Sequence, residues 1–152
     1  MNINLVIRKA VVSDINDILQ IEHASFQVDC FSKGQFKYLL SHAIFYVAEN
    51  NKKILGYYIL LTKRRSKKVR LYSIAVHPNA RGENVGQVLM YHLIHVAKEM
   101  YYSCVTLEVR ENNVQAIQLY EKFGCVQRGI KTHYYVDGAN ALIMHCYLNE
   151  KD

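Results

Sequence analysis

The sequence contains one proline, no tryptophan and only seven glycines among 152 residues. It has no apolar run near the roughly 20 residues that a membrane helix needs, and its first residues lack the uninterrupted apolar core of a signal peptide. Gly/Ser-rich and single-residue tracts are also missing, so a flexible linker or a disordered arm is not expected. These absences indicate a single soluble domain over residues 1–152, located in the cytoplasm and without membrane contact.

Metal and redox motifs are scarce as well. The four cysteines, Cys30, Cys104, Cys125 and Cys146, are far apart, and none belongs to a C-x-x-C pair. We therefore expect reduced, mostly buried thiols. The seven histidines are not paired with Cys, Asp or Glu at metal-ligand spacing, so no metal site is predicted and His77 is not expected to be catalytic.

Positive charge is in excess, with a formal net charge of +6 that favours an anionic ligand or an acidic partner. Much of it lies in KRRSKK, residues 63–68, between two strand-like runs. Two interpretations of this segment stay open: a solvated hairpin loop, or a contact with RNA or an acidic polypeptide. No RNA-binding signature with interleaved aromatic residues accompanies the cations, so direct nucleic-acid binding is not expected.

Hydrophobic periodicity predicts a β-α-α-β-β-β-α-β-α-β-β order, which indicates an α/β domain with a mixed sheet. Ser13 is the predicted N-cap of the first helix. Ser32 and Gln35 have capping-box spacing for the second helix, and Phe31 and Phe36 occupy its staple positions. The predicted strands cover residues 2–10, 43–49, 54–62, 69–77, 104–110 and two runs within 128–148.

The same hydrophobic periodicity predicts two further helices. One begins at Val85 and ends near Met100, and a shorter one stops at Gly124, which suits the left-handed position after a helix. In the tail, Asp137 and Gly138 form a short-range hairpin signal between the last two strand-like runs.

Residues 77–86, HPNARGENVG, join a strand-like run to a helix-like run and contain two of the seven glycines. A strand–loop–helix step of this kind presents free backbone N–H groups and the positive end of the helix dipole to an anion. Gly82 and Gly86 would let the backbone approach a phosphate where a Cβ would obstruct it. The segment is therefore either a pyrophosphate-binding loop or a tight turn with an N-terminal cap.

The stretch IAVHPNARGENVGQVLM resembles the acetyl-CoA-binding motif of the GNAT superfamily of N-acetyltransferases, written Q/R-x-x-G-x-G/A after a strand. Arg81 and Gly86 match its ends, while Asn84 stands where the middle glycine is usual. Asn is the non-glycine residue best able to adopt positive φ, so the loop conformation is compatible with this change.

Two other stretches resemble the N-terminal protein acetyltransferases, a subgroup that includes the bacterial enzyme acting on the N-terminal alanine of ribosomal protein S18. They are IEHASFQVDCFSKGQF and the long block LEVRENNVQAIQLYEKFGCVQRGIKTHYYVDGANALIM. Cys30-Phe31 replaces the Pro-Trp common in the subgroup, and residues 139–141 replace its more usual acidic residues. The similarity spans nearly the whole chain.

The resemblance implies the GNAT fold, a mixed and mostly antiparallel central sheet of about seven strands flanked by about four helices. It implies acetyl-CoA as cosubstrate, no metal, and a monomer or weak dimer. The residues implied in cofactor binding are Ile74, Ala75, Val76, Arg81, Gly82, Glu83, Asn84, Val85, Gly86, Gln87 and Asn113. Those implied in the acceptor pocket are Glu22, Phe26, Phe31, Tyr134 and Tyr135.

The same resemblance implies Glu108 as general base, acting through water, and Tyr120 as general acid for the CoA thiolate. From the residues alone, Glu108 is equally an outward-facing solvated glutamate, and Tyr120 an ordinary core tyrosine. Asn113 is a helix N-cap, a cofactor contact, or both.

The predicted reaction is direct, ternary-complex acetyl transfer to the N-terminal α-amine of a protein, with ribosomal protein S18 as one candidate acceptor. An α-amine, with a reference pKa of about 8, is more easily deprotonated near neutrality than a lysine amine at about 10.4. Two alternatives stay open: acetylation of a small-molecule amine or a protein lysine, and a non-catalytic CoA-sensing or RNA-associated module.

Overall fold

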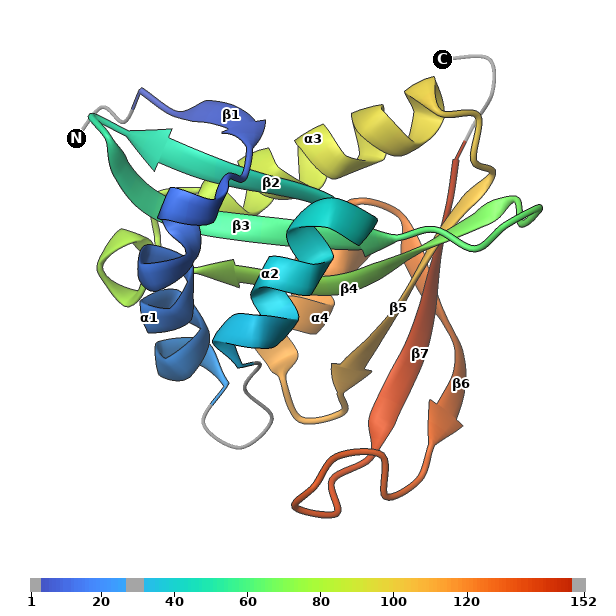
Figure 1. Cartoon of the computed structure of the whole chain (residues 1–152). Helices are drawn as coiled ribbons and strands as arrows, with labels where there is room; N and C mark the ends of the chain where they lie inside the picture. Colours follow the sequence, from blue (N-terminus) through green and yellow to red (C-terminus); the bar gives the residue numbers. More distant parts are fainter. Residues whose placement is uncertain (1–3, 27–31, 149–152) are drawn as a thin grey trace.

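The computed structural model describes residues 4–26 and 32–148 (Figure 1). Its strands form one sheet in the order β1-β2-β3-β4-β5-β7-β6. All neighbouring strands are antiparallel except β4 and β5, which are parallel. The elements in chain order are β1 (Val6–Lys9), α1 (Ile15–Ser25), α2 (Lys33–His42), β2 (Ile44–Asn50), β3 (Lys53–Leu61), β4 (Lys68–Val76), α3 (Val85–Glu99), β5 (Cys104–Arg110), α4 (Val114–Lys122), β6 (Cys125–Lys131) and β7 (Ala141–Tyr147). The predicted fold class and element order are confirmed.

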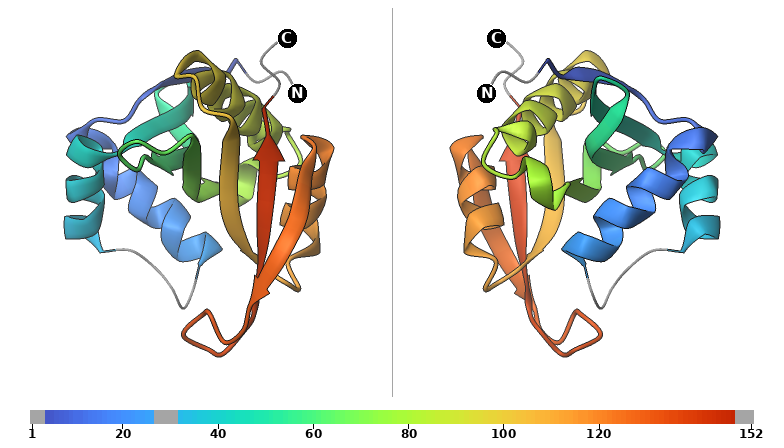
Figure 2. Two further views of the ribbon diagram at one scale, coloured as in Figure 1. Left: turned by 90° about the vertical axis from the view of Figure 1, so that its right-hand side faces the viewer. Right: turned by 90° about the vertical axis from the view of Figure 1, so that its left-hand side faces the viewer.

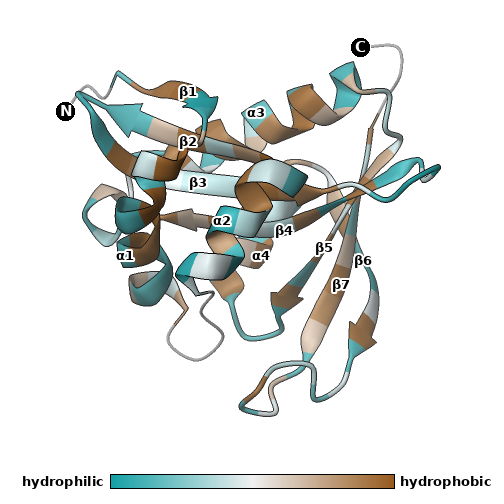
Figure 3. Cartoon of the chain, viewed as in Figure 1, coloured by the Kyte–Doolittle hydropathy of each residue, from teal (hydrophilic) through white to brown (hydrophobic). Residues whose placement is uncertain are grey.

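The four helices divide between the two faces of the sheet (Figures 1 and 2). Helices α1 and α2 lie over β2, β3 and β4, where Phe36, Phe45 and Tyr57 pack with their ring centroids about 6 Å apart. Helices α3 and α4 lie on the opposite face, and the buried residues of α3 form a second apolar cluster with those of β4, β5 and β7. Figure 3 shows the brown, apolar residues following the strands and the inner sides of the helices. The sheet is thus the middle layer between two separate cores.

The parallel contact between β4 and β5 is short. Only residues 68–70 of β4 pair with residues 104–106 of β5, and beyond this point the two strands diverge. In Figure 1 the arrowheads of β4 and β5 point in clearly different directions. The remaining length of each strand therefore borders an opening in the sheet, and the candidate site lies there.

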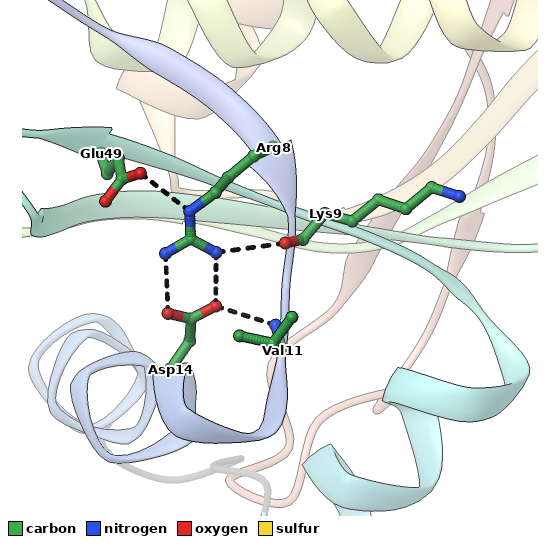
Figure 4. Close-up of polar contacts among 5 residues, drawn as sticks. All are labelled: Arg8, Lys9, Val11, Asp14 and Glu49. Atoms are coloured by element: carbon green, nitrogen blue, oxygen red, sulfur yellow. Dashed lines mark hydrogen bonds and ion pairs between the residues drawn. The ribbon is translucent and has the colours of Figure 1, made fainter.

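An arginine joins the start of the chain to the sheet (Figure 4). Arg8 of β1 donates two hydrogen bonds to Asp14, at 2.8 and 2.9 Å, and one to Glu49 of β2 at 2.8 Å. Asp14 also accepts the backbone N–H of Val11 at 2.8 Å. The Arg8 hydrogen bonds lower the pKa of the Asp14 carboxyl, so their stabilisation is present above its ordinary pKa and is lost as the pH falls through the lowered value.

This arrangement corrects the predicted start of the first helix. Ser13 lies inside a 3-10 turn, Val12–Asp14, and α1 begins at Ile15 with Asp14 as its N-cap. The carboxylate of Asp14 binds Arg8, six residues earlier on β1, and the Val11 amide. These contacts hold residues 12–14 in the 3-10 turn, so α1 starts after Asp14 although Ser13 has the residue type of an N-cap.

The other helix ends follow their local signals. The Ser32 hydroxyl accepts the Gln35 N–H at 3.2 Å, and the Gln35 side chain accepts the Ser32 N–H at 2.6 Å, so the predicted capping box is confirmed. Phe36 is fully buried, while its expected staple partner Phe31 lies outside the described residues. Gly124 follows α4 with a φ of +83°, the left-handed conformation predicted for it.

The C-terminal hairpin is confirmed, but its turn is not the expected tight one. Strands β6 and β7 pair antiparallel, yet Asp137 and Gly138 lie within the longer connection of residues 132–140. The reason is Arg110 of β5, whose guanidinium bonds both carboxylate oxygens of Asp137 at 3.0 and 3.1 Å and lies 4.3 Å from the centroid of the Tyr135 ring. These contacts draw the loop toward β5 instead of extending the two strands.

The cysteine prediction is wrong in part. Cys125 and Cys146 face each other directly on β6 and β7, with Cα atoms 4.0 Å apart, and form a disulfide. Cys104 is free and buried, as expected, and Cys30 lies outside the described residues. The pair meets because of strand register, which the spacing of cysteines in the sequence does not reveal.

Within residues 4–26 and 32–148, none of the helices combines the length and apolar character needed to span a membrane.

Candidate active site

The divergence of β4 and β5 opens a cavity of about 750 Å³. One wall comes from the end of α1, a second from β4, a third from β5 and α4, and the floor from the loop of residues 132–140. The sequence-predicted residues that line it are Glu22, Phe26, Ile74, Glu108, Asn113, Tyr120, Tyr134 and Tyr135. The consecutive elements β5 and α4 bring both predicted catalytic residues, Glu108 and Tyr120, into a cavity whose other walls come from earlier and later parts of the chain.

The loop after β4 has the backbone geometry of an anion site. The His77 ring accepts the Asn79 N–H at 3.0 Å and caps a 3-10 turn, which gives this histidine a structural role. Gly82 has a φ of +87° and Asn84 a φ of +64°, both left-handed. The first backbone hydrogen bond of α3 runs from the Val88 N–H to the Asn84 carbonyl at 3.1 Å.

Because that bond is the first, the amides of the first turn of α3 have no intrahelical acceptor. Among the described residues, no other backbone acceptor is recorded for the amides of residues 85–87 either. They point out of a helix N-terminus next to Gly82, where a Cβ would meet nothing within 4 Å. The residues present therefore fit a bound pyrophosphate, with open backbone donors at a positive dipole end.

Not every predicted loop residue has a side chain free for a ligand. Val85 is buried in the core, and a Cβ on Gly86 would lie 3.3 Å from Leu119 of α4, so this glycine also serves helix packing. Arg81 donates to the Ser25 hydroxyl at 3.3 Å and so joins the loop to the end of α1. Contacts at Val85 and Gly86 are accordingly restricted to their backbone amides.

The strand before the loop offers backbone groups in the same way. Residues 56 and 57 of β3 pair with Val76 and Ala75, while the other edge of this part of β4 has no partner strand among the described residues. The Ala75 side chain is buried in the cluster under α1 and α2. The His77 N–H bonds the Leu55 carbonyl of β3 at 2.7 Å, and backbone groups alternate between the two sides of a strand, so those of Ala75 face β3. Ile74 and Val76 can therefore offer their backbone groups along the open strand edge.

The predicted base is held between two cations. Arg70 of β4 donates to one carboxylate oxygen of Glu108, from Nε at 3.0 Å and from Nη2 at 2.7 Å, and Lys131 of β6 lies 3.4 Å from the other. The Glu108 side chain is only 12% exposed. It is therefore not the outward-facing solvated glutamate of the alternative interpretation.

Arg70 also links the base to the acceptor wall. Its Nη2 donates to the Tyr134 hydroxyl at 3.0 Å, and the Lys131 ammonium lies 5.1 Å from the centroid of the Tyr134 ring. Sequence reasoning missed both cations, since no local pattern marks an arginine or a lysine on a strand as a neighbour of Glu108. Only the strand order, which sets β4 and β6 on either side of β5 and β7, reveals them.

Tyr120 lines the same cavity from α4 and is 7% exposed. Burial raises the pKa of its phenol, with a smaller contribution from Tyr135, so the hydroxyl stays protonated through neutral pH. No hydrogen-bond partner is recorded for it among the described residues. A protonated phenol facing a cavity is suited to donate a proton.

The acceptor end contains a buried polar group. Glu22 of α1 is 1% exposed and accepts a hydrogen bond from the Tyr57 hydroxyl, which lies 3.3 Å from the Ser73 hydroxyl of β4. Glu22 and Ser73, which both line the cavity, are thus joined through the Tyr57 hydroxyl. The expected pocket residue Phe31 lies outside the described residues.

Two predicted cofactor residues also border a different depression. Asn84 and Gln87 line a groove of about 620 Å³ on the outer side of α3, together with Tyr91 and His92. Glu83 lies in the loop between the main cavity and this groove. Asn113, in contrast, lines the main cavity while its side chain accepts the Ala116 N–H at 3.2 Å, so it is a helix N-cap at the cavity edge.

A set of metal ligands is not present among the described residues. Within the described part of the chain, no group of three His, Cys, Asp or Glu side chains lies close enough to hold an ion.

A parallel strand pair that opens into a cavity, a loop with the backbone geometry of an anion site, and a carboxylate and a buried phenol inside the cavity are features that suit acyl transfer from a CoA thioester. The chain belongs to the acetyltransferase (GNAT) family, whose model matches residues 13–125, and it is an N-acetyltransferase. The family uses acetyl-CoA as donor.

Individual relatives agree with this family. A protein of Bacillus subtilis (strain 168), provisionally named a ribosomal protein bS18-alanine N-acetyltransferase, is 31% identical over 99% of this chain and 100% of its own length. An N-alpha-acetyltransferase of Sulfolobus acidocaldarius is 30% identical, covering 93% of this chain and 92% of the relative. The crystal structure of the ribosomal-protein-S18-alanine N-acetyltransferase from Escherichia coli superposes with a TM-score of 0.85 at 26% identity, over 96% of this chain and 95% of that one.

Proposed function

We propose that this protein transfers the acetyl group of acetyl-CoA to the N-terminal α-amine of a protein, by direct attack within a ternary complex. The observation that carries the proposal is the placement of Glu108, a largely buried carboxylate inside the cavity where β4 and β5 diverge, with Tyr120 in the same cavity. Relatives over the whole chain length that are named for α-amine acetylation support the choice of acceptor.

The cosubstrate is assigned to the β4 side of the cavity. Backbone amides of Gly82 and of residues 84–87 bind its pyrophosphate, since the Glu83 amide already donates to the Ala80 carbonyl. The open edge of β4 at Ile74 and Val76 pairs with its pantetheine arm. Arg81 adds a cation at the loop, and Asn113 a polar contact at the start of α4. Bound there, acetyl-CoA supplies an activated acyl group with a thiolate as leaving group.

Glu108 accepts the proton that the amine loses as its nitrogen bonds the acetyl carbon. Arg70 and Lys131 keep the carboxylate fixed at both oxygens. Lys131 uses one of the two lone pairs of its oxygen, and a water molecule that relays the proton is proposed to bond the other. The two cations also disfavour a charged ammonium beside them, which selects the neutral amine that reacts.

Tyr120 gives its hydroxyl proton to the leaving thiolate. Burial makes this phenol a weaker acid than a free thiol, whose ordinary pKa is about 8.5, so the transfer to sulfur is uphill and is completed as the phenolate takes a proton back from water. Glu108 gains the proton that the amine loses and later returns it to water, so protons balance and the products are an acetylated amine and free CoA.

The acceptor is assigned to the opposite end of the cavity, against Glu22 and Phe26 of α1 and Tyr134 and Tyr135 of the 132–140 loop. The buried Glu22 supplies a carboxylate oxygen for the approaching amine. The working unit is proposed to be a monomer or weak dimer. Ribosomal protein S18 is the first acceptor to test, because relatives are named for it.

A panel of N-terminal peptides incubated with the enzyme and acetyl-CoA, read by mass spectrometry, tests this function. It should include the S18 N-terminus, the same peptide with a blocked α-amine, and internal-lysine peptides. We expect a mass increase of one acetyl group on free α-amines and none on the blocked peptide. Exclusive modification of lysines, or of added polyamines, would contradict the proposal.

A further inference from the structure

The turn between β3 and β4, with one residue of β6, forms a cationic surface that the acetyl-transfer reaction does not use. We define the basic surface as Lys63, Arg64, Arg65, Lys67, Lys68 and Arg128, all of them exposed. Among the described residues, none of these side chains has a recorded ion pair with an acid. The turn is coloured as strongly hydrophilic at the right of Figure 3, before the start of β4.

Strand register sets aromatic side chains next to these cations. Lys68 pairs with Cys104, and Cys104 pairs with Tyr147, so these three side chains share one face of the sheet. With strands about 4.8 Å apart, Tyr147 lies roughly 10 Å from Lys68. The next row on that face contains Thr106 and His145.

The rings are accessible from solvent. Tyr147 is 53% exposed, and its ring lies 5.9 Å from that of His145 at an interplanar angle of 73°. Helices α1 and α2 cover β2 to β4, while α3 and α4 lie on the opposite face. Figure 2 shows this face of β5, β7 and β6 without a covering helix in the part of the chain that the structure describes.

The surrounding charges are almost all positive. Among the described residues of β4, β5, β6 and β7, Glu108 is the only acidic side chain, and it is bound by Arg70 and Lys131. Burial, together with the charges of Lys68 and Arg128, lowers the pKa of His145, so its ring is neutral at physiological pH. A polyanion thus meets uncompensated cations beside a neutral ring and a tyrosine.

We propose that the basic surface and the adjoining face of β5 and β7 bind single-stranded RNA. Phosphates contact the cations, a base stacks on Tyr147, and the Thr106 hydroxyl and the His145 ring are placed to bond a 2′-hydroxyl. An acidic polypeptide would use the cations but not the exposed ring, which is why RNA is the better fit. The aromatic residues missing from the sequence around KRRSKK come from a strand about eighty positions later.

This interaction changes the expectation that the protein does not contact nucleic acid. That expectation depended on the absence of aromatic residues near the cations in sequence, and the register of β4, β5 and β7 supplies them in space. The inference does not depend on which amine the enzyme acetylates, and its test needs no acetyl-CoA.

Fluorescence anisotropy with a labelled uridine 12-mer tests it, titrated with the full chain at several salt concentrations. We expect saturable binding whose affinity falls steeply with salt. The variant Lys63→Gln/Arg64→Gln/Arg65→Gln should bind at least about tenfold more weakly and reduce the slope of log K against log salt by about 2, since each phosphate contact to a single strand contributes about 0.7. Tyr147→Ala should weaken binding about fivefold or more, and Tyr147→Phe should not.

The matched control is Lys33→Gln/Lys37→Gln/Lys53→Gln, which removes the same charge from exposed positions on α2 and β3. If this control weakens RNA binding as much as the loop variant does, the attraction is general and the proposal is wrong. A polyglutamate peptide serves as a competitor. If it displaces the RNA and its own affinity is unchanged by Tyr147→Ala, the partner is an acidic polypeptide and the RNA proposal is wrong. If a thymidine 12-mer of single-stranded DNA binds with the same affinity as the uridine 12-mer, the assignment to RNA is wrong.

Discussion

The two ends of the cavity are built by different means. The cofactor end consists of backbone: a loop with left-handed residues Gly82 and Asn84, the open amides at the start of α3, and the open edge of β4. The acceptor end consists of side chains from distant elements, of which the Arg70–Glu108–Lys131 cluster is the central one. One end depends on a contiguous segment of chain, the other on the order of strands.

This difference has an energetic side. Backbone donors at a helix start are already oriented, so binding an anion there costs little reorganisation. Charged side chains at the other end must be held by each other, and removing one leaves its partners uncompensated in a largely buried place. Substitutions should therefore change cofactor affinity at one end and turnover at the other, with little effect across the cavity.

Glu108→Gln should have the largest effect. The amide has the same shape but cannot accept the amine proton, so we expect kcat to fall about 1,000-fold, within the range for loss of a general base. The dissociation constant for acetyl-CoA should stay within about twofold of the wild-type value. Steady-state kinetics and calorimetry measure the two quantities, and an equal loss in both would mean that the two ends are not separable.

Tyr120→Phe should follow, with kcat reduced about 100-fold and the ring packing retained. Because burial raises the pKa of this phenol, the proton is present throughout the working range and would be lost only above that pKa. The wild-type pH–rate profile should accordingly show no loss from this group up to about pH 9. A variant with unchanged kcat would leave Tyr120 as a core residue only.

Gly82→Ala tests the cofactor end. Its φ of +87° costs a residue with a Cβ about 1 kcal/mol, which corresponds to about fivefold weaker acetyl-CoA binding if the loop shifts to relieve it. Turnover at saturating acetyl-CoA should be unchanged. Gly34→Ala in α2, where the nearest atom would be 3.9 Å away, is the control and should alter neither quantity.

Asn84→Gly should have the smallest effect. Asn84 is already left-handed at φ +64° and its side chain caps no amide of α3. Glycine relaxes this conformation, so acetyl-CoA affinity should be preserved or improved by no more than about twofold. A markedly raised dissociation constant would show that the Asn side chain contacts the cofactor directly.

The same division explains what the sequence could predict. The loop of residues 77–86, the N-cap at Asn113 and the capping box at Ser32 are local patterns, and the structure has the features that these patterns indicate. The order of helices and strands along the chain follows from hydrophobic periodicity, and the family resemblance adds the mixed, mostly antiparallel sheet. Local chemistry was therefore enough for the fold and for the cofactor loop.

Long-range contacts account for the rest. Arg70 and Lys131 meet at Glu108, and Cys125 meets Cys146, because strands fall into a particular register. Tyr147 reaches the basic surface in the same way. None of these pairs has a spacing that a single sequence distinguishes from chance, since a shift of two residues along either strand would separate them.

The short seam between β4 and β5 has a mechanical consequence. Three residue pairs join the β1–β4 part of the sheet to the β5–β7 part, and α3, which packs on β3, β4 and β5, spans the junction. A sheet so narrowly joined bends most easily along that line, and the cavity lies on it. Ligands that contact both β4 and β5 stabilise the pairing of these two strands. Amide hydrogens of residues 68–70 and 104–106 should therefore exchange more slowly when acetyl-CoA and acceptor are both present.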